Sequence, residues 1–291
     1  MKRLLVGLIG ANIQKSLTPA LQQEACRAAG LDGYYHLMDL DALPGRSLES
    51  LLDAARTAGF AGVNVTYPCK EAVLPLLDEV SGEARQIGAV NTVTIGPGGR
   101  TAGYNTDRIG FRRAFEEAFG RAAIAGKVAL LVGAGGAGRA VAFALFDLGV
   151  ETLLINDTDA DRAHRLAQSL QASSGGGRSR AVTDAVSELT EAAGVVNATP
   201  VGMLGFPGMP IPLSAIGGRH WVADVIYTPL ETELLKGARA KGCKVMGGAG
   251  MCVHQAVESF HLFTGCAADL HRMQRTFAEA AARREKDLMA G

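Results

Sequence analysis

A glycine-rich turn between an apolar run and a helical pattern constrains the fold more than any other feature. The segment VALLVGAGGAGRAVAFALFDLG contains the spacing Gly133-x-Gly135-x-x-Gly138, which is typical of dinucleotide-binding loops. In such loops the first glycine permits the tight turn, the second lets the backbone approach a pyrophosphate, and the third allows close packing of helix on strand. The N-terminus of the following helix would offer N–H groups to the phosphates. A bare match also occurs in loops that bind no nucleotide, but the flanking strand and helix favour nucleotide binding. The expected contacts are Gly133, Ala134, Gly135, Gly136, Ala137 and Gly138.

The cofactor preference depends on Asp157, which directly follows the next strand-like run, ETLLIN. It stands close to the spacing of about 20 residues expected for the acid that accepts hydrogen bonds from the adenosine ribose. A carboxylate there repels a 2′-phosphate, so the sequence predicts NAD rather than NADP. Two alternatives stay open. Asp157 could simply begin the turn NDTDADR, and Arg162 could pair with a phosphate if the loop folds back, which would allow NADP.

Strand-like runs that lead into helical patterns recur along the chain. LLVGLIG precedes ALQQEACRAAG, GVNVTYP precedes KEAVLPLLDEV, and VALLVGAGGAG precedes RAVAFALFDLG. This alternation predicts a doubly wound α/β architecture with mostly parallel sheets. GVVNATPVGM and HWVADVIYTP predict two further strands, and the polar segment 172–180 predicts a surface loop.

A domain boundary is expected near residue 120. The segment IGPGGRTAGYNTD predicts a hairpin or loop, and RIGFRRAFEEAFG predicts a helix with Thr106 or Asp107 as its N-cap. Residues 1–120 then form one domain and residues 121–249 a dinucleotide-binding domain. Two helical patterns in residues 250–291 could return to cover the first domain.

Composition indicates a small-molecule partner. The 291 residues are 48% apolar, and 29 basic residues balance 29 acidic ones, so no net field attracts nucleic acid or an anionic membrane. No apolar run approaches the roughly 20 residues that span a bilayer. Five cysteines without a CxxC pair argue against a disulfide framework and favour a reducing, cytoplasmic compartment. Length and composition are compatible with a monomer or a homodimer.

A lysine and an aspartate are candidates for proton transfer. Lys70, in TYPCKEAVLPLL, lies at or just before the predicted first turn of a helix. The helix dipole and partial burial would favour an uncharged amine, which can act as a general base toward a hydroxyl. Asp107 could orient that amine, although its charge would favour the protonated form. The alternative is an ordinary solvated lysine and an ordinary helix cap.

Eight blocks in fixed order resemble the shikimate/quinate dehydrogenase family along nearly the whole chain. They are SLTPA, GVNVTYPCKE, GAVNT, GYNTD, GAGGAG, NATPVGM, DVIYTPLETELL and GMCVHQAV. The resemblance implies a first domain that binds a polyhydroxylated cyclic carboxylate and a Rossmann-type domain that binds a nicotinamide nucleotide. It also implies that Lys70 and Asp107 are the catalytic pair.

The resemblance further implies individual binding residues. Ser16 and Thr18 match a hydroxyl pair that binds the substrate carboxylate. This chain has Ser-Leu-Thr-Pro where shikimate-specific members have Ser-x-Ser-Pro, which resembles members that also accept quinate. The remaining expected substrate contacts are Asn64, Thr66, Asn91, Tyr227 and Gln255. The remaining expected cofactor contacts are Asn156, Asp157, Arg162, Asn197, Ala198, Thr199, Met203, Val225, Gly248 and Met251.

The expected function is the reversible, NAD-dependent oxidation of a ring hydroxyl of shikimate or quinate to the 3-dehydro ketone. One alternative is an NADP-dependent biosynthetic shikimate dehydrogenase. Another is a nucleotide-binding regulator without catalysis, which the presence of both Lys70 and Asp107 disfavours. No metal is expected, because His254 and His261 share a helical pattern but no carboxylate completes a site with them.

Overall fold

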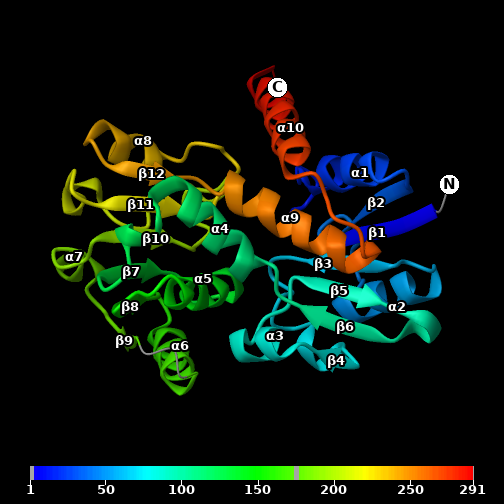
Figure 1. Cartoon of the computed structure of the whole chain (residues 1–291), viewed down its shortest axis with the longest axis horizontal. Coiled ribbons are helices and arrows are strands. Elements are labelled where there is room, and N and C mark those ends of the chain that lie inside the picture. The colour runs from blue at the N-terminus through cyan, green and yellow to red at the C-terminus, as the bar shows by residue number, and fades with distance from the viewer. Residues whose placement is uncertain (1–2, 174–176, 291) are drawn as a thin grey trace. The chain divides into compact units, whose positions relative to one another are not determined.

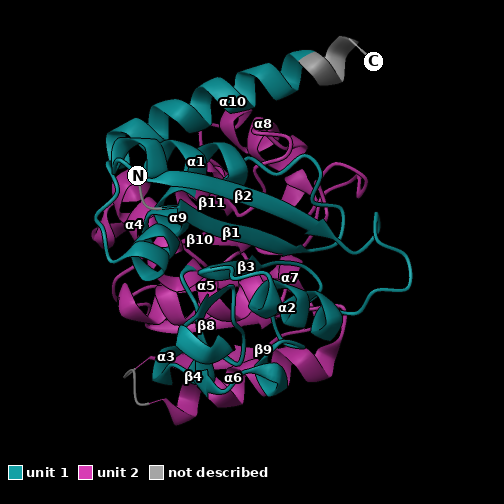
Figure 2. Ribbon diagram, turned by 90° about the vertical axis from the view of Figure 1, so that its right-hand side faces the viewer, with its two compact units in different colours: residues 1–106, 253–291 teal, residues 107–252 magenta. Residues whose placement is uncertain are grey.

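The computed structural model describes residues 3–173 and 177–290. The chain divides into two compact units, which Figure 2 colours separately. Unit 1 comprises residues 1–106 and 253–291, and unit 2 comprises residues 107–252. Each unit contains one six-stranded sheet. None of the described helices is long and apolar enough to cross a membrane.

Unit 1 is a mixed sheet with helices packed against it (Figure 1). Its strand order is β2-β1-β3-β5-β6-β4, and β1 pairs in parallel with both β2 and β3. The antiparallel pair β5–β6 is the predicted hairpin. The strands are β1 (Arg3–Gly10), β2 (Asp32–Asp39), β3 (Gly62–Val65), β4 (Glu79–Val80), β5 (Thr92–Ile95) and β6 (Thr101–Tyr104). The helices are α1 (Thr18–Ala28), α2 (Leu48–Thr57), α3 (Gly82–Ile87), most of α9 (Ala249–Thr264), and α10 (Leu270–Ala290).

Unit 2 contains an all-parallel sheet with the order β12-β11-β10-β7-β8-β9. The chain starts at a central strand, runs outward to one edge, returns and runs outward to the other. This is the doubly wound topology of dinucleotide-binding proteins. The strands are β7 (Val128–Val132), β8 (Thr152–Asn156), β9 (Arg178–Ala181), β10 (Gly194–Asn197), β11 (Trp221–Asp224) and β12 (Lys244–Met246). The helices are α4 (Asp107–Phe119), α5 (Gly136–Asp147), α6 (Ala160–Ala172), α7 (Ala185–Glu188) and α8 (Glu233–Ala240). The predicted α/β class with parallel sheets is confirmed.

The units divide at residues 106 and 252 rather than at the expected 120 and 249. The reason is the packing of α4 on unit 2. The rings of Phe115 and Phe119 lie 5.0 and 5.7 Å from the Trp221 ring of β11. Arg108 donates two hydrogen bonds, of 2.7 and 2.6 Å, to Asp147 of α5. These contacts join α4 to the unit that follows it in the sequence.

The C-terminal helices return to unit 1, as the sequence predicted. Gln22 of α1 is 1% exposed, and its amide nitrogen donates to the carbonyl of Ala256 (3.0 Å) and to the hydroxyl of Ser259 (2.9 Å) in α9. Arg284 of α10 donates to the carbonyl of Lys15 at 3.2 Å. Part of the polar segment predicted as a surface loop, residues 174–176, lies outside the described residues.

The helix predicted to begin at Lys70 is wrong. Residues 67–73 form turns, followed only by the short 3₁₀ helix Leu74–Leu76. Pro75 has no backbone N–H and its ring crowds the preceding turn, so an α-helix through this segment is disfavoured. Lys70 therefore does not lie at the N-terminus of an α-helix, and the dipole of the predicted helix does not act on its amine.

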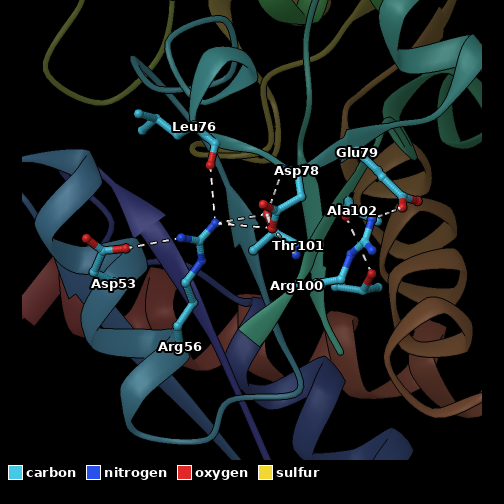
Figure 3. A network of polar contacts seen from close by, with 9 residues as sticks. Asp53, Arg56, Leu76, Asp78, Glu79, Arg100, Thr101 and Ala102 are labelled. Atoms are coloured by element: carbon cyan, nitrogen blue, oxygen red, sulfur yellow. Dashed lines mark hydrogen bonds and ion pairs between the residues drawn. The ribbon is translucent and has the colours of Figure 1, made fainter. Parts of the chain in front are cut away.

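An arginine cluster fastens this turn segment to the rest of unit 1 (Figure 3). Arg56 of α2 donates to the carbonyl of Leu76 (3.3 Å) and to the hydroxyl of Thr101 (3.0 Å) at the start of β6. The backbone and hydroxyl of Thr101 donate to Asp78, and these hydrogen bonds hold the pKa of that carboxyl below its ordinary value. The cluster joins α2, the segment before β4, and the β5–β6 hairpin.

Candidate active site

The glycine loop has the steric features that the fingerprint requires. Gly133 has φ of 101°, a conformation that favours glycine. A β-carbon at Gly138 would lie 2.0 Å from the carbonyl oxygen of Gly133, so only glycine fits there. Gly135 precedes α5 and provides no side-chain cap, and a β-carbon built on it would meet no atom within 4 Å. The first turn of α5 therefore keeps N–H groups that a bound anion can reach.

Asp157 is attached to the glycine loop. Its Oδ2 accepts a hydrogen bond of 2.6 Å from the backbone N–H of Ala134, and its Oδ1 accepts one of 2.9 Å from Asp159. The backbone of Asn156 joins the same loop, because its carbonyl accepts from Gly133 at 2.8 Å. Asp157 thus stabilises the turn that follows β8, as the alternative interpretation proposed. It also lies beside the glycine loop. Arg162 is exposed and lies 3.7 Å from Asp159.

The loop after β10 is organised by Asn197. Its amide nitrogen donates to the carboxylate of Asp224 and to the carbonyl of Val201, both at 3.1 Å, while its oxygen accepts from Thr199. A β-carbon on Gly133 would lie 2.8 Å from the Ala198 carbonyl, so the Asn197–Thr199 loop lies against the glycine loop. The structure thereby brings these predicted cofactor residues together.

The backbone just after β11 also lies close to the backbone just before α9. A β-carbon on Gly248 would lie 2.1 Å from the carbonyl oxygen of Val225, and Val225 donates to the carbonyl of Asn197 at 3.0 Å. Gly248 and Val225 therefore extend the same group of residues. Met251 is 5% exposed in α9, whereas Met203 is partly exposed in the loop after β10.

Asp224 is fully buried, and burial raises its pKa to about 6, while hydrogen bonds from Ile226, Thr232 and Asn197 oppose this shift. Since folding favours the protonated carboxyl, its contribution to stability is greatest below the unfolded pKa of about 4 and is lost as pH rises through about 6. We expect the free energy of unfolding of the wild type, minus that of Asp224→Asn, to fall by about 2 kcal/mol from about pH 4 to about pH 7.

Urea unfolding at several pH values measures this difference. Asp184→Asn is the matched control, because hydrogen bonds from Ser187 and Val186 lower the pKa of exposed Asp184. The stabilising contribution of Asp184 is present above its unfolded pKa and is lost as pH falls. The difference in free energy of unfolding between the wild type and Asp184→Asn should therefore rise with pH, opposite to the change for Asp224→Asn. A pH-independent difference for Asp224→Asn would contradict the assignment.

In unit 1, Ser16 and Thr18 form a hydroxyl pair at the start of α1. The Ser16 hydroxyl donates to the Thr18 hydroxyl at 3.2 Å and accepts from the Thr18 backbone N–H at 3.3 Å. Both residues are partly exposed. Short hydroxyls at a helix start, together with backbone N–H groups there, can bind a carboxylate.

Asn64, Asn91 and Gln255 belong to one hydrogen-bond network. Asn91 is 4% exposed, and its amide nitrogen donates to the Thr106 hydroxyl (3.0 Å) and to Oε1 of Gln255 (3.2 Å). Asn64 of β3 donates to the Thr92 hydroxyl (3.0 Å), which in turn donates to Oδ1 of Asn91 (3.0 Å). Both amide protons of Asn91 are thus donated within the protein.

Hydrogen bonds at and beside Asn91 hold the backbone at or next to the two residues of the predicted catalytic pair, Lys70 and Asp107. The carbonyl of Lys70 accepts a 2.8 Å hydrogen bond from Val90, the residue before Asn91. Oδ1 of Asn91 accepts a 2.8 Å hydrogen bond from the backbone N–H of Thr106, the residue before Asp107. Lys70 is partly exposed and Asp107 is 1% exposed at the start of α4.

Thr66 and Tyr227 are two further predicted substrate contacts. Thr66 follows β3, and its methyl group lies over Gly10. Tyr227 lies in unit 2 after β11 and is partly exposed.

Sequence reasoning missed three members of the network. Tyr35 of β2 is 3% exposed and donates to Oδ1 of Asn64 at 2.8 Å, and Thr92 and Thr106 complete the chain of hydrogen bonds. A tyrosine in a strand reads as an apolar residue, so its position in the sequence gives no signal. Thr106 was considered only as a helix cap, although GYNTD already contains it.

Comparison with known proteins agrees with this arrangement. Residues 8–93 match the shikimate dehydrogenase substrate binding domain, and residues 248–276 match the shikimate 5′-dehydrogenase C-terminal domain. A quinate/shikimate dehydrogenase (NAD(+)) of Corynebacterium efficiens is 49% identical, over 94% of this chain and 97% of its own. A shikimate dehydrogenase (NADP(+)) of Pseudarthrobacter chlorophenolicus is 45% identical, over 97% and 96%. A structure of quinate dehydrogenase from Corynebacterium glutamicum in complex with NAD has a TM-score of 0.87 and 44% identity, covering 96% of this chain and all of that one.

The doubly wound sheet and its glycine loop define a dinucleotide-binding protein with a second α/β unit, and the relatives named above identify it as a nicotinamide nucleotide-dependent oxidoreductase. More specifically, the chain belongs to the shikimate/quinate dehydrogenase family.

Proposed function

We propose that this protein catalyses the reversible NAD-dependent oxidation of one ring hydroxyl of quinate or shikimate to the 3-dehydro ketone. The observation that carries the proposal is Asp157, whose carboxylate is hydrogen-bonded to Ala134 of the glycine loop. A negative charge there disfavours a 2′-phosphate. The identity of 49% with a relative named quinate/shikimate dehydrogenase (NAD(+)) supports the same choice.

The residues of unit 2 fit a dinucleotide. The uncapped first turn of α5 suits a pyrophosphate, and the missing side chain at Gly135 leaves space for it. We assign the ribose to Asp157 and the nicotinamide side of the site to the Asn197–Thr199 loop, Val225 and Gly248. Asn156, Arg162, Met203 and Met251 are proposed as outer contacts. Unit 2 is accordingly proposed as the nucleotide-binding domain, and unit 1 as the substrate-binding domain.

The proposed chemistry uses Lys70 and Asp107. NAD, when bound, supplies the acceptor for the hydride that leaves the carbinol carbon. The neutral amine of Lys70 accepts the hydroxyl proton, and in the reverse direction its ammonium form returns the proton to the ketone oxygen. Asp107 orients Lys70 and the hydroxyl. The hydrogen bond from Val90 holds the backbone of Lys70, and that from Thr106 to Asn91 holds the backbone just before Asp107, so neither position depends on a helix at Lys70.

The proposed substrate contacts divide by chemistry. Ser16 and Thr18 bind the carboxylate, and Asn64, Thr66 and Gln255 bind ring hydroxyls. Asn91, whose amide protons go to Thr106 and Gln255, orients Gln255, and Tyr227 is proposed as a further substrate contact. A polyol requires donors and acceptors at fixed angles, and the shared network gives these amides fixed orientations. The five cysteines, which all lie in the described part of the chain, are thiols rather than disulfides, in keeping with a proposed reducing, cytoplasmic location.

A panel of four steady-state assays tests the proposal by pairing quinate or shikimate with NAD or NADP. We expect the kcat/KM with NAD to exceed that with NADP by at least about tenfold for both acids, because Asp157 opposes the 2′-phosphate. The Ser-Leu-Thr-Pro sequence leads us to expect turnover of quinate as well as shikimate. A preference for NADP with shikimate alone would instead support the biosynthetic alternative, and one relative is named shikimate dehydrogenase (NADP(+)). Turnover in none of the four assays would refute the proposal.

A further inference from the structure

A buried carboxylate, Asp39, holds the loop that leads to Ser16 and Thr18. It ends β2 and is 2% exposed. Its Oδ1 accepts hydrogen bonds of 3.1 Å from the backbone N–H groups of Asn12 and Asp41. Its Oδ2 accepts from the backbone of Ile13 (3.2 Å) and from the side-chain amide of Gln14 (3.0 Å). Three of the four donors therefore come from the β1–α1 loop.

The loop adopts a conformation that needs such support. Asn12 has φ of 55°, the left-handed region that most side chains avoid. Its backbone N–H and that of Ile13 point at Asp39, and Ser16 then donates to the carbonyl of Ile13 at 2.9 Å. Two hydrogen bonds, on either side of the Ile13 backbone, thus join Asp39 to the backbone N–H of Ser16, whose hydroxyl pairs with that of Thr18.

We propose that Asp39 is a positioning residue for the substrate carboxylate, acting through the Asn12–Gln14 backbone on the Ser16 and Thr18 hydroxyls. This inference rests on the proposed function. Asp39 is too buried to contact substrate itself. Its negative charge would repel a carboxylate at long range, so a positioning role and a purely electrostatic role predict opposite changes in affinity when the charge is removed.

Asp39→Asn tests the inference. Asparagine has one acceptor oxygen where aspartate has two, and its NH₂ group would oppose the N–H donors of the loop. We expect KM for quinate and shikimate to rise by about tenfold, while kcat and KM for NAD stay within about twofold. A cyclohexane polyol that lacks the carboxyl should show the same kcat/KM in both proteins. If the long-range repulsion by the Asp39 charge outweighed its positioning of the loop, KM for the two acids would instead fall in Asp39→Asn.

Three further variants make the test specific. Ser16→Ala and Ser16→Ala/Asp39→Asn complete a double-mutant cycle, in which the inference requires clearly non-additive effects on KM. Asp32→Asn, at the exposed opposite end of β2, is the matched control and should leave KM unchanged. Gln14→Ala removes one of the four donors from an exposed position. It should raise KM about twofold to threefold even if Asp39→Asn does not fold.

The outcomes separate the inference from the proposed function. Turnover of either acid by the wild type, with KM unchanged or lowered in Asp39→Asn and unchanged in Gln14→Ala, would overturn the inference alone. Additive effects in the cycle, or an equal loss with the polyol, would also overturn it. If the wild type turned over neither acid, the proposed function would fail and the inference with it.

Discussion

Replacing Lys70 with alanine is expected to lower kcat for quinate and shikimate by about 10³-fold, while the affinity for NAD stays within about twofold. The proposed role of Lys70 is proton transfer in unit 1, whereas the residues assigned to NAD lie in unit 2. Removing the amine should therefore slow the chemical step without disturbing the nucleotide. Steady-state kinetics gives kcat, and titration of intrinsic fluorescence or calorimetry gives the dissociation constant of NAD.

Two controls distinguish lost proton transfer from lost structure. Lys70→Arg keeps a positive charge and a long side chain, but guanidinium stays protonated and cannot accept the hydroxyl proton. It should be nearly as slow as Lys70→Ala. Small primary amines added to Lys70→Ala should restore part of the turnover, and the rate should increase with pH as the free amine forms. Turnover of Lys70→Ala close to that of the wild type would show that another group transfers the proton.

The second large effect is expected at Asp157. Asp157→Arg removes the charge that opposes a 2′-phosphate and adds a guanidinium suited to bind one. The ratio of kcat/KM with NAD to that with NADP should fall on the order of 100-fold, equivalent to about 3 kcal/mol. The four-assay panel measures this ratio directly.

Asp157→Asn separates charge from loop support. The wild-type carboxylate also accepts the hydrogen bond from Ala134, so any substitution can loosen the glycine loop and weaken both nucleotides. Asparagine keeps an acceptor oxygen but no charge. The ratio of kcat/KM with NAD to that with NADP should therefore lie, for Asp157→Asn, between the ratios for the wild type and Asp157→Arg. If both variants lost activity with NAD and NADP in equal proportion, Asp157 would support the loop without selecting the nucleotide.

The glycine loop could be predicted because its constraint is local. Gly133 and Gly138 stand in contact within one turn, and the requirement for glycine at both positions follows from that short separation. The strands of unit 2 were predictable for a related reason, since β7 is a continuous apolar run and β8 has the buried apolar centre Leu153, Leu154 and Ile155. Position in the sequence was enough to locate these elements.

The surroundings of Lys70 and Asn91 could not be predicted in the same way. KEAVLPLL has the periodicity of a helix, but Pro75 and the hydrogen bond from Val90 to Lys70 favour turns. Asn91 bonds to Thr106 and to Gln255, which is distant in sequence and reaches it only because α9 returns to unit 1. Asp39 likewise has no signal in the sequence, because three of its four donors come from residues 25 to 27 positions earlier in the chain.

The division of unit 1 between both ends of the chain has a consequence for biosynthesis. Gln22 and Asn91 bond to residues of α9, which the ribosome adds only after all of unit 2 has been made. A nascent chain must therefore carry the six strands of the first sheet without α9 and α10, and the side-chain amides of Gln22 and Asn91 wait for their partners in α9 while unit 2 can already close. Chaperones that act during translation should accordingly engage residues before 107 for longer than those that follow.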